Sequence, residues 1–150
     1  MRRVILQEPA HIHPFNEPAR DLRVQNVPLW LWQRDLLASM VTEEREYADW
    51  DQAIAHEVDG DQALLVHRDN LFFSAAFIEE FLRRSRQAGR PTQAALRCDD
   101  PAVSQHILPL TRTMKRDKNL LLADLWYLPD SIGERDAAEP LVVDTEPREV

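Results

Sequence analysis

One stretch in the middle of the chain constrains the fold more than any other. Residues 63–66 form a continuous apolar run, which is typical of a strand buried on both faces of a sheet. Ser74 is a good helix N-cap, and apolar residues then recur at helical spacing until Gly89 and Pro91, where a helix must end. Residues 93–97 resume an extended pattern. A strand, a helix and a strand in this order predict a βαβ unit and an α/β fold.

Apolar patterns elsewhere extend this interpretation to the whole chain. We predict a three-layer, Rossmann-like α/β domain over residues 1–150, in which helices flank a mostly parallel sheet. The expected strands lie near residues 3–6, 63–67, 93–97, 120–127 and 141–144. A helix is expected to begin near Pro28, the charged residues 42–46 are expected to form a solvated surface segment, and residues 145–150 are expected to form a polar tail.

Composition narrows the class of partner. The chain has 18 basic and 26 acidic residues, so its formal charge is −8, and we expect it not to bind nucleic acid. No apolar run is long enough for a membrane span, and the single cysteine, Cys98, fits a reducing cytoplasm, where we expect the protein. The three glycines lie far apart, which excludes a glycine-rich phosphate loop. The sequence leaves open whether the chain forms a homo-oligomer.

The order of motifs resembles a known family. The run His67-Arg68-Asp69-Asn70-Leu71 ends the apolar strand, a helix follows, and the next strand leads to Asp99-Asp100-Pro101. This stretch resembles the middle of the sugar-phosphate nucleotidyltransferases, in which a buried strand delivers an aspartate in a Gly-Asp-Asn-Leu type of turn. The N-terminal pattern, from residues 3–6 through Pro14-Phe15 to Pro28, is similar to the opening strand, signature loop and first helix of that family. The resemblance covers roughly half of the chain.

The resemblance implies a fold like that of the nucleotide-diphospho-sugar transferases. It also implies a function. It implies that a nucleotide or sugar phosphate binds at the carboxyl ends of the strands. If the chain is active, the implied reaction is nucleotidyl transfer between a nucleoside triphosphate and a sugar 1-phosphate. Asp69 would bind Mg²⁺, because this cation prefers carboxylate and phosphate oxygens. Arg20 would act as the catalytic cation, and the substrate would contact Gln7, Glu8, His11, His13 and Asn70.

Four departures from the family pattern leave catalytic competence open. The loop after the first strand, residues 7–13, contains no glycine, and Ala19 aligns with the lysine of the family. The segment between the first helix and the strand that ends before Asp69 is short and lacks a second glycine-rich loop. A second metal-binding aspartate can be assigned only by position, to Asp144. The chain is therefore interpreted as a divergent domain, which is either a trimmed protein or the N-terminal part of a longer one, and a non-catalytic interaction or regulatory module is an alternative.

Two alternatives concern individual residues. Asp69 and Asn70 can form a turn whose side chains bind only nearby backbone groups. His11 and His13 point the same way in an extended chain and could bind zinc together, which would indicate a metal-dependent hydrolase. His67 lies within the buried strand, and we expect it to be packed or hydrogen-bonded rather than to bind a metal.

The zinc alternative can be tested by metal analysis. We expect no tightly bound zinc, because no third or fourth ligand lies at a spacing typical of zinc sites. Untagged protein purified without chelator should contain far less than one zinc per chain. About one zinc per chain that is lost in His11→Ala would contradict this prediction and favour the hydrolase.

Overall fold

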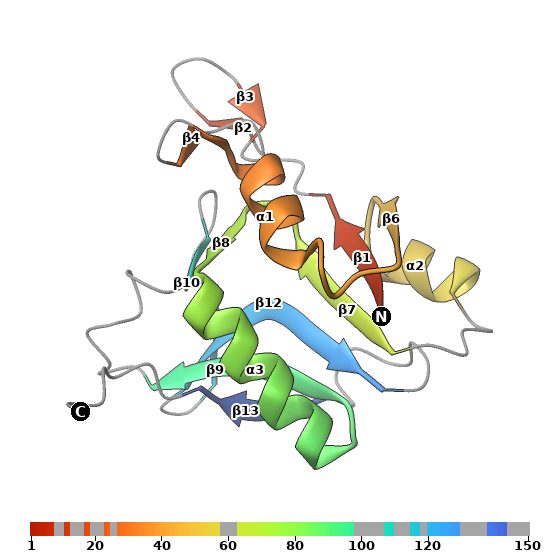
Figure 1. Cartoon of the computed structure of the whole chain (residues 1–150), viewed down its shortest axis with the longest axis vertical. Coiled ribbons are helices and arrows are strands. Elements are labelled where there is room, and N and C mark those ends of the chain that lie inside the picture. Colours follow the sequence, from red (N-terminus) through yellow and green to blue (C-terminus); the bar gives the residue numbers. More distant parts are fainter. Residues whose placement is uncertain are drawn as a thin grey trace.

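A mixed β-sheet forms the middle layer of the computed structural model, which describes residues 1–7, 11–12, 17–18, 23–24, 27–57, 63–97, 107–109, 115–117, 120–129 and 138–143 (Figure 1). In these ranges the sheet has seven strands. They are β1 (Arg2–Leu6), β6 (Glu43–Tyr47), β7 (Leu64–Arg68), β9 (Thr92–Arg97), β11 (Lys115–Asp117), β12 (Leu120–Leu128) and β13 (Glu139–Val142). Their order is β13-β9-β12-β7-β1-β6, and β11 pairs with β12 off this path.

Strand directions confirm the predicted mostly parallel sheet. β1 is parallel to β6 and β7, and β13 is parallel to β9, whereas β12 is antiparallel to both β7 and β9. β12 therefore runs against the other five strands of the path. It also lies between β7 and β9, so the two strands of the predicted βαβ unit are parallel but are not neighbours. A local sequence pattern could not predict this, because β12 follows later in the chain.

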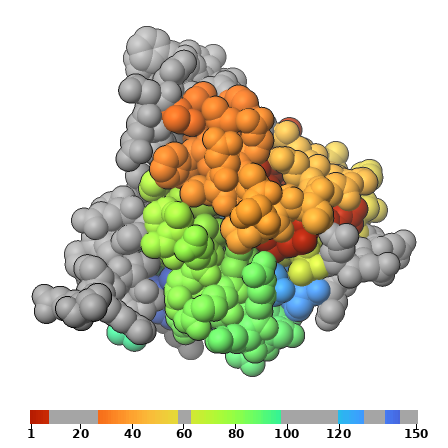
Figure 2. Space-filling view, in the orientation of Figure 1, coloured from red at the N-terminus to blue at the C-terminus, as the bar shows by residue number. Residues whose placement is uncertain are grey.

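Helices cover both faces of the sheet, as expected for three layers. α1 (Leu29–Leu37) and α3 (Ala75–Ala88) pack on the face to which Leu65 points, and they lie side by side over it in Figure 2. α2 (Trp50–His56) packs on the other face against Leu64 and Val66. Successive β7 residues thus belong to two different cores, because side chains alternate across a strand.

Helix α3 has the boundaries that its sequence predicts. The Ser74 hydroxyl accepts a hydrogen bond from the Phe77 N–H at 3.2 Å, which caps the first turn. One stripe of the helix is buried in the core. At the other end Gly89 adopts a left-handed conformation with φ 66°, and its N–H donates to the Ser85 carbonyl.

The charged residues 42–46 lie at the surface as predicted, but the sequence did not predict that most of them belong to a strand. Residues 43–47 form strand β6 at the edge of the sheet. Pairing with β1, rather than local propensity, makes this segment a strand. Charged side chains along an edge strand hinder pairing with other chains, which explains how such a sequence suits this position.

The remaining strands form short pairs outside the main sheet. They are β2 (His11–Ile12) with β3 (Glu17–Pro18), β4 (Arg23–Val24) with β5 (Val27–Pro28), and β8 (Leu71–Phe73) with β10 (Ile107–Pro109). Among the described residues, no helix has the length and apolar character needed to cross a membrane. The predicted tail and Asp144 lie outside the described residues.

The conformation of Gly89 leads to a stability prediction. Gly89→Ala should lower the free energy of unfolding by about 1 kcal/mol, because a β-carbon disfavours the left-handed conformation. Gly89→Asn should cost less, since asparagine tolerates this region better. Urea unfolding of the three proteins measures the difference. An alanine variant as stable as the parent would show that Gly89 is not required for the end of α3.

Candidate functional site

The carboxyl ends of β1 and β7 meet at one edge of the sheet, which we call the β1–β7 edge. Gln7 follows β1, and the turn Asp69–Asn70 follows β7. The chain continues from β1 to β6 and from β7 to β9, in opposite directions along the sheet. Open α/β sheets bind ligands outside the carboxyl ends of their strands at such a point of divergence. The topology thus indicates this edge as the candidate site.

The turn at this edge is packed into the domain. Asp69 is 4% exposed and Asn70 is 1% exposed. The Asp69 N–H donates to the Leu6 carbonyl at 2.9 Å, which extends the pairing of β7 with β1 by one residue. The acidic side chain is therefore delivered by a rigid strand and not by a loose surface loop, as positioning of a ligand requires.

A partly buried ion pair joins β7 to β12 beside the turn. The Arg68 Nε lies 2.8 Å from Asp124 Oδ2 on β12, and Arg68 Nη1 donates to the Gln7 carbonyl at 3.2 Å. The Gln7 N–H in turn donates to the Tyr47 carbonyl at the end of β6. These contacts hold the ends of β1, β6 and β7 together, and they neutralise the carboxylate of Asp124.

A second polar group reaches the turn from helix α1. Gln33 is 1% exposed, and its side-chain amide donates to the carbonyls of Asp69 and Leu71. No prediction from the sequence concerned this residue. A signal exists in retrospect, since Gln33 lies four residues from both Leu29 and Leu37 and interrupts the buried apolar stripe of α1 with a polar side chain.

His67 is fully buried and binds Arg3, which also donates to the Gln33 amide. Its Nε2 accepts a hydrogen bond from Arg3 Nε at 2.9 Å, and its Nδ1 lies 2.9 Å from the Arg68 carbonyl. A carbonyl can only accept, so the geometry assigns the proton to Nδ1 and a neutral ring. The ring also packs edge-to-face on Phe73. The expectation of a packed, hydrogen-bonded histidine is confirmed.

The structure brings together part of the predicted site. Gln7, Asp69 and Asn70 all lie at the β1–β7 edge. Glu8, His13 and Arg20 lie outside the described residues, and for His11 only the backbone, in β2, is described. The roles assigned to these seven residues stay predictions.

The family resemblance predicts that this edge binds magnesium. Within the described ranges no three histidine, cysteine, aspartate or glutamate side chains are placed to hold a metal ion. Asp124 is ion-paired with Arg68, and Asp69 is the carboxylate to which the family resemblance assigns the cation. Mg²⁺ is often bound by one or two carboxylates and the phosphates of a substrate, and such a shared site is compatible with these residues.

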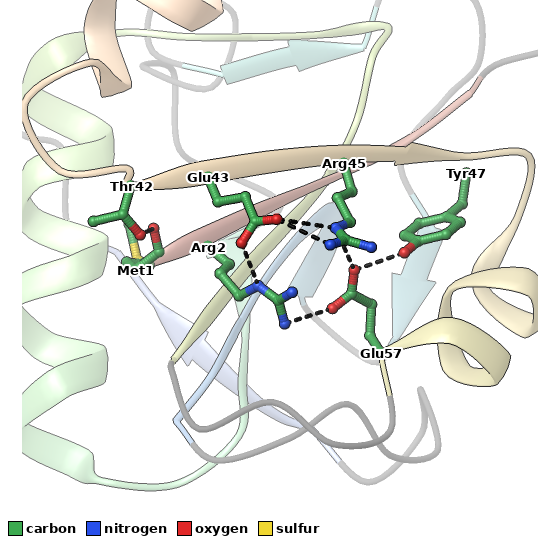
Figure 3. Close-up of polar contacts among 7 residues, drawn as sticks. All are labelled: Met1, Arg2, Thr42, Glu43, Arg45, Tyr47 and Glu57. Carbon is green, nitrogen blue, oxygen red and sulfur yellow. Dashed lines mark hydrogen bonds and ion pairs between the residues drawn. The ribbon is translucent and has the colours of Figure 1, made fainter.

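A separate polar cluster lies where β1 and β6 face the end of α2 (Figure 3). Glu57 is 2% exposed, and its Oε1 accepts a hydrogen bond from the Tyr47 hydroxyl at 2.6 Å. Arg2 Nη1 lies 2.8 Å from Glu57 Oε2, but no hydrogen bond is directed at that oxygen, so this contact is an ion pair alone. Arg45 bridges Glu43 and Glu57. The cluster connects the end of α2 to β1 and β6 at the edge of the sheet.

The pKa shifts in this cluster have clear causes. Burial, followed by the hydrogen bond to Glu57 and its negative charge, raises the pKa of Tyr47. The hydrogen bond from Arg45, followed by the charge of Arg2, lowers the pKa of the exposed Glu43. Because the carboxylate of Glu57 is already bound by Tyr47 and Arg2, we interpret the cluster as structural.

The shift at Tyr47 predicts a pH dependence of stability. A raised pKa means that the folded state favours the neutral phenol, so its contribution is present below the unfolded value of about 10 and is lost as the pH rises through the folded value. Tyr47→Phe should lower the free energy of unfolding by about 2 kcal/mol at pH 7, because a hydrogen bond to a buried carboxylate is lost. The difference between the two proteins should shrink above pH 10. Urea unfolding across this range checks it, and a constant difference would contradict the assignment.

Comparisons with known proteins complete the description. No protein-family model matches the chain, and no curated protein matches it significantly. A similar solved structure is that of a Bacillus anthracis chain assigned as a glucose-1-phosphate thymidylyltransferase, in complex with sucrose. The identity is 14%, the match covers 85% of this chain and 70% of that chain, and the TM-score is 0.49. The fold class given above rests on the strand order and layers of this chain.

Proposed function

We propose that the β1–β7 edge binds a nucleotide or a sugar phosphate. The observation that carries the proposal is the buried Asp69–Asn70 turn, which a central strand delivers to the point where the chain connections diverge. The sequence around this turn resembles the nucleotidyltransferase motif. This resemblance indicates a nucleotide or a sugar phosphate as the ligand. The net charge of −8 disfavours a nucleic acid as the partner.

In this proposal each residue of the edge has a distinct role. Asp69 holds Mg²⁺ jointly with phosphate oxygens, and the cation, when bound, neutralises charge on the phosphates. Asn70 and Gln7 contact the substrate from the ends of β7 and β1. Arg68 and Asp124 keep these two strand ends in place through the ion pair described above.

The preceding loop supplies the remaining roles in the proposal. Glu8, His11 and His13 contact the sugar or the phosphates, and Arg20 supplies the positive charge that favours transfer. Transfer itself would be an in-line displacement at phosphorus, for which the protein mainly positions groups and neutralises charge. We propose binding as the function and nucleotidyl transfer as its reaction if the chain is active. The cytoplasm is the proposed compartment, since nucleoside triphosphates and sugar phosphates are the proposed ligands.

Calorimetric titration tests the proposal directly. UTP, dTTP, GTP and glucose 1-phosphate are titrated into the protein with Mg²⁺, and at least one should bind with submillimolar affinity. Asp69→Asn should weaken this binding at least tenfold, which equals about 1.4 kcal/mol, because the neutral side chain cannot hold the cation.

Asp35→Asn is the matched control, since Asp35 is an exposed aspartate of α1 away from the turn. It should leave the affinity unchanged. If no ligand binds at millimolar concentration, the proposed function is wrong, and a non-catalytic interaction module becomes the better interpretation.

A further inference from the structure

We propose that Gln33 is the positioning residue of the β1–β7 edge: it holds the Asp69–Asn70 turn in its ligand-binding geometry and couples helix α1 to the site. The inference rests on the proposed function and deepens it, because it identifies what fixes the turn before a ligand arrives. It concerns a residue that makes no proposed contact with the ligand and acts through Asp69 and Asn70.

Both N–H donors of the Gln33 amide bind backbone carbonyls of the turn. Nε2 donates to the Asp69 carbonyl at 3.2 Å and to the Leu71 carbonyl at 2.8 Å. A primary amide has two N–H donors, so both are used. The two carbonyls flank Asn70 in the chain. One side chain from another element therefore fixes the backbone on both sides of this residue.

The orientation of this amide is itself determined by a neighbour. Gln33 Oε1 accepts from Arg3 Nη2 at 3.4 Å. Arg3 is held in turn by Glu44 and by Nε2 of His67, and it is 2% exposed. If the amide were reversed, its oxygen would face the two turn carbonyls and its NH₂ would face a guanidinium, so only the observed orientation satisfies all groups.

The buried position of Gln33 indicates that its hydrogen bonds to the turn have a structural role. Gln33 occupies a position of the stripe that is otherwise apolar, between Leu29 and Leu37, and an apolar residue would satisfy the packing there. It would leave the carbonyls of Asp69 and Leu71 without this donor in a buried environment. A polar residue at this place is accounted for by the turn. Because α1 follows the β4–β5 pair in the chain, the amide also connects this part of the chain to the turn.

The first test separates positioning from general stability. Gln33→Met keeps the length of the side chain and removes both donors, whereas Leu37→Ala opens a cavity in the same helix stripe without removing a hydrogen bond to the turn. The backbone ¹³C′ chemical shifts of Asp69 and Leu71 report hydrogen bonding at these carbonyls. They should move in Gln33→Met and stay in place in Leu37→Ala. Unchanged shifts in Gln33→Met would overturn the proposal.

The second test measures the effect on binding, with UTP and Mg²⁺ as the probe. Gln33→Met should weaken UTP binding about tenfold, and in the double variant with Asp69→Asn it should cause no further loss, because it acts through that residue. Additive losses in the double variant would overturn positioning through Asp69 while leaving the proposed function intact. If the wild-type protein binds none of UTP, dTTP, GTP and glucose 1-phosphate but the carbonyl shifts move as expected, Gln33 orders the turn and the proposed ligand class is wrong.

A conservative variant covers the case in which Gln33→Met does not fold. Gln33→Glu has the same shape, and its carboxyl group can donate a hydrogen bond only when it is protonated. The groups around it are the turn that carries Asp69 and the side chain of Arg3, which in turn binds His67 and Glu44. The Leu71 ¹³C′ shift should therefore approach the wild-type value as the pH falls. A shift that is independent of pH and equal to that of the wild type would overturn the proposal.

Discussion

Strand β7 can exist only inside this fold, because all five of its residues are buried. β1 and β12 pair with its two edges, and the α1–α3 layer and α2 cover its two faces. An isolated strand of this composition would leave its backbone groups and its apolar side chains in water. The place of β7 at the centre of the sheet in turn determines where its carboxyl end emerges. The Asp69–Asn70 turn is thus positioned by the most constrained element of the domain.

Polar residues at the end of this strand have to be satisfied inside the protein. His67 and Arg68 point to opposite faces, and each has a partner on its own side: Arg3 on one face and Asp124 on the other. Unpaired buried polar groups are costly, so such networks restrict the conformations that the surrounding backbone can adopt. The same contacts that satisfy the buried polar residues also make this edge rigid. A ligand site requires such rigidity.

Strand β6, at the outer edge of the sheet, is stabilised by different contacts. β6 is exposed and charged, and its own side chains would not predict a strand. It is held by backbone pairing with β1 and by the cluster of Arg2, Glu57 and Tyr47, which connects it to α2. Its open edge carries charges that disfavour association with other strands. Ion pairs and hydrogen bonds therefore add to the apolar packing of Tyr47 and Trp50 at this edge.

The sequence alone determined the elements whose signals are local. The apolar run of β7, the Ser74 cap and the left-handed Gly89 each act within a few residues, and the predicted strands and α3 agree with the structure. The position of Asp69 and Asn70 after a buried strand could be predicted for the same reason. Their functional roles could not, since those depend on a ligand.

Only the tertiary structure decided which distant residues meet. Arg3 and His67 are 64 positions apart, and Gln33 lies 36 positions from Asp69 and 38 from Leu71. The insertion of β12 between β7 and β9 and the formation of β6 likewise depend on strand pairing across long separations. A sequence pattern reports the preferences of neighbouring residues, whereas these contacts form only because sheet pairing and helix packing bring separate segments together. The partners of the turn therefore became visible only with the fold.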